Sequence, residues 1–72
     1  MLAEDALQRY DSLTSRERQV FAMVVHGKLN KEIASALGTS ERTIKAHRAR
    51  VMDKMGVASV AALTRVAALL GM

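Results

Sequence analysis

Apolar residues recur along most of this chain at three- and four-residue spacing, which is the period of an amphipathic helix. The pattern forms four stretches, and each lies between a helix-capping residue and a glycine. The first stretch opens with a capping box, in which the side chains of Thr14 and Glu17 satisfy each other's free backbone amides. We expect a structural role for Glu17, as a capping residue that could also pair with a nearby arginine. The four predicted helices are capped by Thr14, Asn30, Ser40 and Ser59, and they end near Gly27, Gly38, Gly56 and Gly71.

Residues 1–12 carry only a weak helical pattern, because Leu2, Ala6 and Leu7 could share a face but no strong cap precedes them. We interpret this segment as an N-terminal tail or the end of a linker helix, and residues 13–72 as the domain proper. The chain holds no strand candidate, and one Tyr, one Phe, no Trp and no Pro favour helices. The sequence therefore predicts an all-α fold, a compact four-helix bundle of 72 residues.

The connection between the second and third predicted helices is very short. Only Gly38 and Thr39 separate them before the cap at Ser40. So short a connection forces the two helices to pack at a steep angle, as in a helix-turn-helix. The sequence thus predicts a helix-turn-helix motif over residues 30–49, with its second helix at about residues 41–55.

The spacing inside this motif supports the interpretation. With Asn30 as the first of twenty positions, the small Ala34 lies where the next helix crosses, and Gly38 allows the positive φ of a sharp turn. His47 occupies the eighteenth position, which is usually apolar in such motifs, so the match is good but not complete. The apolar residues expected to bury against the rest of the domain are Ile33, Leu37 and Ile44.

Basic residues are concentrated in the centre of the chain. The formal net charge is +4, but residues 1–12 carry −2 and residues 13–72 carry +6. Seven basic and three acidic residues lie within residues 28–54. A basic centre in a small domain indicates a polyanionic partner, although charge alone is equally compatible with a solvated helix surface.

The third predicted helix has an unusual outer side. At roughly 100° per residue, Ile44, Val51 and Met55 point inward together. Two alanines on the opposite side would let the helix backbone approach a groove floor, and alanine methyls can contact thymine methyls. Alanine is also the best helix former, so the pair by itself needs no functional explanation. Because it lies in a basic helix of a helix-turn-helix, we interpret the alanines as a surface that approaches the floor of a DNA groove. The residues predicted to face outward are Arg42, Lys45, Ala46, Ala49, Arg50 and Asp53.

The same sequence argues against several other classes of protein. There is no cysteine, and no nucleophile–base pair, carboxylate pair, Gly-rich phosphate loop or metal-binding constellation is present, so we expect no enzyme, no metal and no cofactor. No apolar run approaches the ~20 residues of a membrane span, and no signal peptide opens the chain. We expect a cytoplasmic protein without a membrane partner.

Several runs resemble the LuxR-type helix-turn-helix domain. They are LTSRERQV at residues 13–20, NKEIA at 30–34 and TIKAH at 43–47, and the HRA run at 47–49 is most similar to the FixJ branch of response regulators. The resemblance covers about residues 13–70. It implies a transcription regulator whose third helix enters the DNA major groove. It also implies the output domain of a phosphorylation-controlled response regulator, with a receiver domain and RNA polymerase as partners, or a stand-alone regulator of the GerE type.

The resemblance also implies roles for individual residues. It implies contacts with base edges or the groove floor from Lys45, Ala46 and Ala49. Relatives often carry a polar residue in place of Ala49, so we expect weaker base reading at that position. Helix N-termini near Lys31 and Thr43 favour phosphate oxygens. The implied phosphate contacts are Lys31, Thr43, His47, Arg50 and Lys54, with Arg42 and Arg48 as secondary candidates.

The last predicted helix, at about residues 60–70, has two sides. The inward side holds Val60, Leu63, Val66, Ala67 and Leu70, and the outer, mostly small and apolar strip holds Ala61, Arg65, Ala68, Leu69 and Met72. The resemblance implies homodimerisation on DNA through this outer strip, although a stable dimer in free solution is not expected for so small an area. Alternatively, the strip is an ordinary Ala-rich helix surface, or the domain is a helical protein-interaction module that binds a receiver domain or polymerase subunit. A promoter-reading domain of a sigma factor is a further look-alike that the NKEIA and TIKAH runs disfavour.

Overall fold

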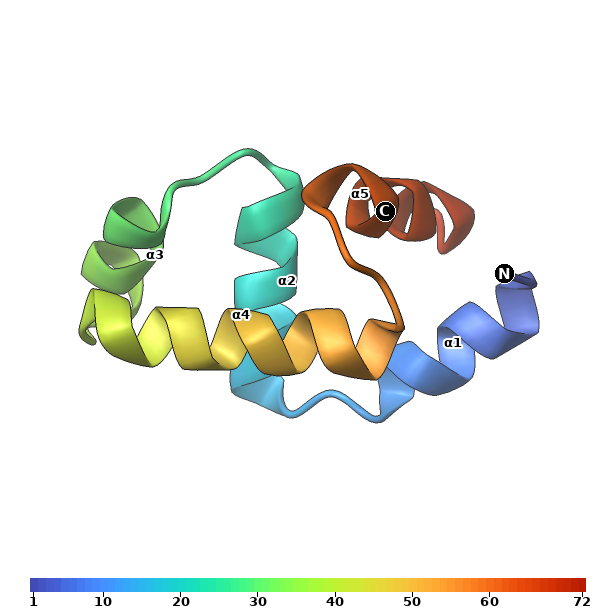
Figure 1. Cartoon of the computed structure of the whole chain (residues 1–72), viewed down its shortest axis with the longest axis horizontal. Helices are drawn as coiled ribbons and strands as arrows, with labels where there is room; N and C mark the ends of the chain where they lie inside the picture. Colours follow the sequence, from blue (N-terminus) through green and yellow to red (C-terminus); the bar gives the residue numbers. More distant parts are fainter.

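The computed structural model describes all 72 residues and contains five α-helices and no strand. The all-α prediction is therefore confirmed. Figure 1 shows α4 running along the length of the molecule, with α2 crossing it, α3 beside its N-terminal half and α1 beyond its C-terminal end. The helices are α1 (Ala3–Asp11), α2 (Ser15–Val25), α3 (Asn30–Leu37), α4 (Glu41–Met55) and α5 (Val60–Leu69).

Three of the four predicted caps are present. The Thr14 hydroxyl accepts from the Glu17 amide, the Glu17 carboxylate accepts from the Thr14 amide, and Ser40 and Ser59 cap α4 and α5 in the same way. The cap predicted at Asn30 is wrong, because Asn30 is already the first residue of α3. The carboxylate of Glu32 instead accepts from the Leu29 amide, 2.8 Å away. The side chain of Asn30 instead accepts a hydrogen bond from Arg48.

The N-terminal segment forms a helix that packs into the fold. We expected a tail or the end of a linker helix, but α1 contacts both α4 and α5, and Ala6 is completely buried. The ring of Tyr10 meets that of Phe21 edge-on, with centroids 5.4 Å apart. The leucines Leu2 and Leu7 remain exposed. The sequence pattern was weak because the one fully buried side chain of this helix is a small alanine.

The core draws on all five helices. The largest fully buried side chains are Phe21, Ile33, Ile44, Met55 and Leu63, and the cluster comprises 13 apolar residues. Leu37, predicted to be buried, is half-buried and packs against this cluster. The helix-period pattern thus identified most of the core, because each helix has one apolar face to bury.

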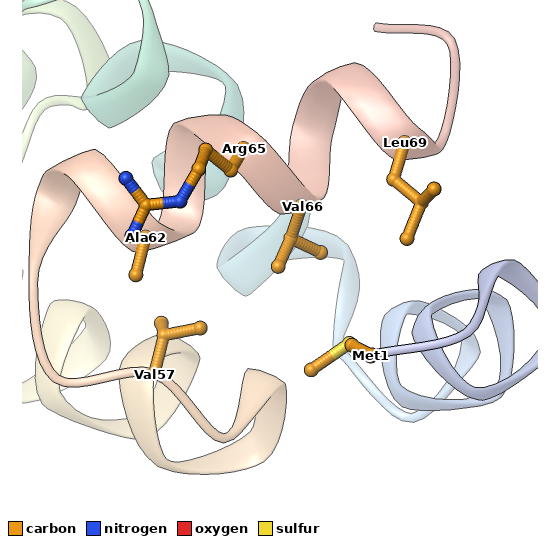
Figure 2. A pocket seen from close by; sticks show the side chains of 6 residues that line it. All are labelled: Met1, Val57, Ala62, Arg65, Val66 and Leu69. Atoms are coloured by element: carbon orange, nitrogen blue, oxygen red, sulfur yellow. The ribbon is translucent and has the colours of Figure 1, made fainter.

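Helix α5 buries Leu63, Val66 and Ala67 as predicted, whereas Val60 is exposed, because it is the first residue of the helix and lies at the edge of the core. An open groove of about 310 Å³ lies between α5, the connection that precedes it and the N-terminal residue Met1 (Figure 2). Its lining residues are Met1, Val57, Ala62, Arg65, Val66 and Leu69. None of the five helices combines the length and hydrophobicity needed to cross a membrane.

Candidate nucleic-acid interface

Helices α3 and α4 form the predicted helix-turn-helix. Gly38 ends α3 in the left-handed conformation, with φ +66°, and the next amide, of Thr39, donates to the carbonyl of Ala34 at 3.0 Å. Ser40 then caps α4 by accepting from the Thr43 amide at 3.1 Å. A left-handed residue followed almost directly by a new cap changes the chain direction sharply within three residues, which gives the turn expected from the sequence.

The side of α4 that faces away from the core matches its prediction. Ile44, Val51 and Met55 are completely buried, and all six residues predicted to face outward are exposed. Ala46 and Ala49 are three residues apart, so their methyl groups lie on one side of the helix. Because both side chains are short, they form a low strip on the outer surface of α4.

The basic residues around this strip carry unneutralised charge. The fold contains one ion pair, between Lys54 and Glu17, so Lys31, Lys45 and Arg50 have no acidic partner within 4.0 Å. All three side chains are exposed, as is Arg42. Thr43 is also exposed, and its hydroxyl accepts a hydrogen bond from the Ser40 hydroxyl at 2.9 Å. The surface that combines α4 with the start of α3 is therefore positively charged and open to a polyanion.

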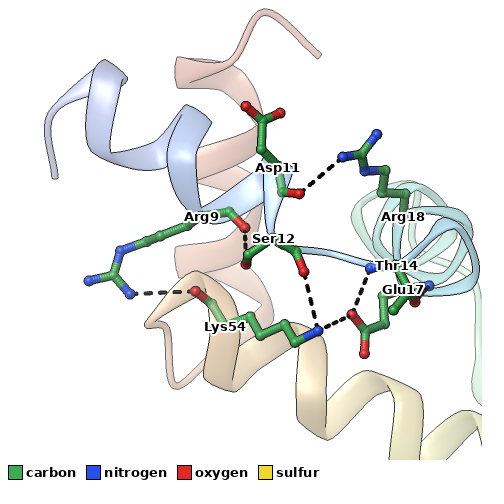
Figure 3. A network of polar contacts seen from close by, with 7 residues as sticks. All are labelled: Arg9, Asp11, Ser12, Thr14, Glu17, Arg18 and Lys54. Atoms are coloured by element: carbon green, nitrogen blue, oxygen red, sulfur yellow. Dashed lines mark hydrogen bonds and ion pairs between the residues drawn. The ribbon is translucent and has the colours of Figure 1, made fainter.

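Lys54 differs from the other predicted phosphate contacts. Its ammonium lies 2.7 Å from Glu17 Oε1 and also donates to the carbonyl of Ser12 at 3.3 Å (Figure 3). This ammonium lowers the pKa of Glu17, the Thr14 amide lowers it further, and burial of the carboxylate opposes both. We predicted a structural role for Glu17 as a capping residue that could also pair with an arginine, but its partner is a lysine. The charge of Lys54 is thus largely neutralised within the fold.

Arg9 and Arg18 surround the same junction (Figure 3). Arg9 Nη1 lies 3.5 Å from the carbonyl of Lys54, and Arg18 donates to the carbonyl of Asp11 at 3.3 Å while its guanidinium lies 5.0 Å from the centroid of the Tyr10 ring. These contacts tie α1 to the end of α4 and to α2. No sequence pattern indicated them, because they depend on how α1 packs against α2 and α4.

The two remaining candidates are half-buried. Arg48 Nη1 donates to Asn30 Oδ1 at 3.0 Å, so this guanidinium is engaged inside the helix-turn-helix. His47 is half-buried, and its Nδ1 is shielded from solvent without a hydrogen-bond partner in the fold. The structure contains no group of three or more His, Cys, Asp or Glu side chains that could hold a metal ion.

The geometry agrees with comparisons with known proteins. The family model described as "Bacterial regulatory proteins, luxR family" matches residues 11–67. The chain belongs to this family. It is a helix-turn-helix DNA-binding domain of the LuxR type, as its sequence predicted, and its relatives are transcription regulators rather than enzymes.

Named relatives support this assignment. The transcriptional regulatory protein FixJ of Azorhizobium caulinodans is 48% identical over 64 residues, which cover 89% of this chain and 30% of that protein. The tetrathionate response regulatory protein TtrR of Salmonella typhimurium is 46% identical over 56 residues, which cover 78% and 27% of the two chains. The crystal structure of full-length FixJ from B. japonicum has a TM-score of 0.88 at 44% identity and covers 97% of this chain and 34% of that one. The chain therefore spans about a third or less of the length of these relatives.

Proposed function

We propose that this LuxR-type domain reads a specific DNA sequence with the outer side of α4 in the major groove, and that it does so to regulate transcription. The observation that carries the proposal is the low strip of Ala46 and Ala49, which lies exposed between basic side chains without acidic partners. The major groove admits an α-helix, and small side chains on its leading side let the helix backbone come close to the base edges. Cations beside that side contact the phosphates that line the groove.

The exposed side chains divide into two roles. Lys45 is the proposed base reader, with Ala46 and Ala49 against the groove floor. Exposed groups at the start of α3 and on α4 contact phosphates, which supply most of the affinity but no direct sequence information. The proposed phosphate contacts are Lys31, Thr43, His47 and Arg50, with Arg42 as a secondary contact, whereas Lys54 contributes mainly to the fold because Glu17 neutralises it.

Its relatives suggest a wider context for the domain. Regulators such as TtrR are named response regulatory proteins, and this chain corresponds to about a quarter to a third of their length. We infer a receiver domain in the full-length protein, contact with RNA polymerase, and action in the cytoplasm. The proposed domain comprises the predicted residues 13–72 together with α1, which packs on α4 and α5. Its proposed dimer contact on DNA is the exposed outer strip of α5: Ala61, Arg65, Ala68, Leu69 and Met72.

The groove beside α5 supports a second candidate function. Its lining is mostly apolar and includes the exposed side chain of Leu69, which is suited to a protein partner. In this alternative, the domain binds a receiver domain or a polymerase subunit through α5, and the positive charge of α4 is incidental. This protein-interaction module would bind DNA weakly or not at all.

A salt titration with two short duplexes tests the proposed function. One duplex is selected from promoter fragments by this protein, and the other has a random sequence. We expect the affinity for both to fall steeply with salt, because phosphate contacts release counterions, and the selected duplex to bind more tightly throughout. Binding without preference would contradict sequence-specific reading, and absence of binding at low salt would favour the protein-interaction module.

A further inference from the structure

Two connections hold α3 and α4 together, one at each end of α3. Gly38 and Thr39 join α3 to α4 at one end, where the chain itself holds the helices together. At the other end, Arg48 Nη1 donates to Asn30 Oδ1 at 3.0 Å, across 18 residues of sequence. Asn30 is the first residue of α3, and Arg48 lies two helical turns into α4. The hydrogen bond therefore connects the two helices at the end of α3 that lies away from the turn.

This bond fixes both side chains. A guanidinium has only hydrogen-bond donors, so the amide of Asn30 must turn its oxygen towards Arg48. Both residues are half-buried, which strengthens a charge-assisted hydrogen bond relative to one in water. Arg48 is thereby directed towards α3, unlike the exposed side chains of Lys45 and Arg50 on the same helix.

The other contacts between α3 and α4 are mainly apolar. Ile33 and Ala34 of α3 and Ile44 of α4 are buried in one apolar cluster. Apolar burial stabilises the contact but has little directional preference, whereas a hydrogen bond depends on distance and angle. The bond between Arg48 and Asn30 is the one side-chain hydrogen bond between α3 and α4, so it adds a directional contact to the short connection and the apolar packing.

The angle between the helices matters for DNA reading, because the two proposed anchors lie on different helices. Lys31 follows Asn30 directly in α3, and Lys45 lies three residues, or about one helical turn, before Arg48 in α4. The bond therefore joins the chain neighbour of Lys31, a proposed phosphate contact, to a residue one turn from Lys45, the proposed base reader. If this angle changed while Lys31 stayed bound to its phosphate, Lys45 would no longer lie next to the base that it is proposed to read.

We propose that Arg48 and Asn30 are positioning residues that set sequence specificity by holding α4 at a fixed angle to α3. This inference rests on the proposed function. It assigns Arg48 a role different from the secondary DNA contact that the family resemblance implies. It also gives a role to Asn30, which is not among the residues predicted to contact DNA.

Asn30→Ala tests the proposal because it removes the acceptor without changing any charge. The measured quantity is the specificity ratio, defined as the affinity for the selected duplex divided by that for the random duplex. We expect this ratio to fall about five- to tenfold, the equivalent of one hydrogen bond, while the affinity for random DNA and the salt slope remain unchanged. Ser35→Ala is the matched control, because it removes an exposed hydroxyl from the same helix and should leave the ratio unchanged.

Two further variants separate positioning from other roles. Asn30→Asp keeps the acceptor oxygen, so we expect it to retain the wild-type ratio while the added negative charge weakens binding to both duplexes alike. Arg48→Gln is made alone and in the Asn30→Ala background. A positioning role predicts no further loss of the ratio in the double variant, since the bond is already broken. A direct phosphate contact by Arg48 instead predicts an additional loss on both duplexes and a salt slope that is smaller by about one.

Thermal unfolding of each variant, followed by circular dichroism, shows whether it is folded at the temperature of the titration. An unchanged ratio in folded Asn30→Ala overturns the positioning role while leaving the proposed function intact. Additive effects of the two substitutions also overturn it. Failure of the wild-type domain to prefer the selected duplex overturns the proposed function and this inference together.

Discussion

The ammonium of Lys54 lies 2.7 Å from the carboxylate of Glu17, and this contact joins the last turn of α4 to the first turn of α2. Glu17 is only 3% exposed, whereas the side chain of Lys54 is 34% exposed. The same carboxylate oxygen accepts the Thr14 amide, so one side chain both caps α2 and anchors α4. The end of α4, the proposed recognition helix, is thereby fixed by a buried carboxylate of α2.

The stability of the domain should depend on pH through Glu17. Because Lys54 lowers the pKa of this carboxyl in the folded state, its contribution is fully present above the unfolded-state value of about 4.3 and is lost as the pH falls through the lower, folded-state pKa. We expect Glu17→Gln to lower the free energy of unfolding by about 1–3 kcal/mol at pH 7 and by less in acid. Urea unfolding from pH 7 to pH 2.5 measures both differences. Glu41→Gln, an exposed residue without an ion pair, is the control, and parallel curves for Glu17→Gln and wild type would contradict the assignment.

The glycine that ends α4 should be less replaceable than the one that ends α3. Gly56 and Gly38 have similar φ angles of +68° and +66°, so alanine costs about 1–2 kcal/mol at either from backbone strain. A Cβ at Gly38 meets nothing within 4 Å, whereas one at Gly56 would lie 2.5 Å from Arg9 Nη1. Gly56→Ala should therefore cost about 0.5–1 kcal/mol more, because Arg9 must leave the Lys54 carbonyl. Thermal unfolding measures the difference, which should vanish in an Arg9→Ala background; an equal cost in the wild-type background would argue against the contact.

Two lysines should affect DNA binding in different ways. Lys31→Ala is expected to weaken binding to every duplex alike and to reduce the salt slope by about one, because a phosphate contact carries no sequence information. Lys45→Ala should cost about 1–3 kcal/mol on the selected duplex and blur one position of the half-site. Titrations against duplexes substituted one base pair at a time measure this. An equal loss on selected and random DNA would exclude Lys45 as a base reader.

The proposed dimer contact on α5 can be tested at Leu69, a residue that is 45% exposed. Leu69→Glu places a charge in the apolar strip, so we expect binding to a duplex with two inverted half-sites to weaken about tenfold or more. Binding to a single half-site should not change, because a monomer suffices there. Gel-shift titrations on the two duplexes provide the comparison. Equal affinities of the variant and wild type for the paired half-sites would contradict dimerisation through α5.

Local physical chemistry accounts for the parts of the fold that could be predicted. The caps at Thr14, Ser40 and Ser59 depend on residues within one helical turn, and the turn at Gly38 depends on the conformational freedom of one residue. The side of α4 that faces outward follows from the 3.6-residue period. These features are encoded over a few neighbouring positions, so the sequence by itself determined the all-helical class, the helix-turn-helix and the exposed strip on α4.

Only the tertiary structure decided which distant groups meet. The sequence placed Glu17 at a cap but did not distinguish Lys54 from an arginine as its partner, which is 37 residues away. The helical period places Arg48 about 40° from the buried Ile44, a hint of its inward direction, but not its contact with Asn30. The docking of α1 through Ala6 was equally hidden, because a small buried side chain gives little periodic signal. Such contacts depend on how whole helices pack, and packing is a property of the assembled fold rather than of any short segment.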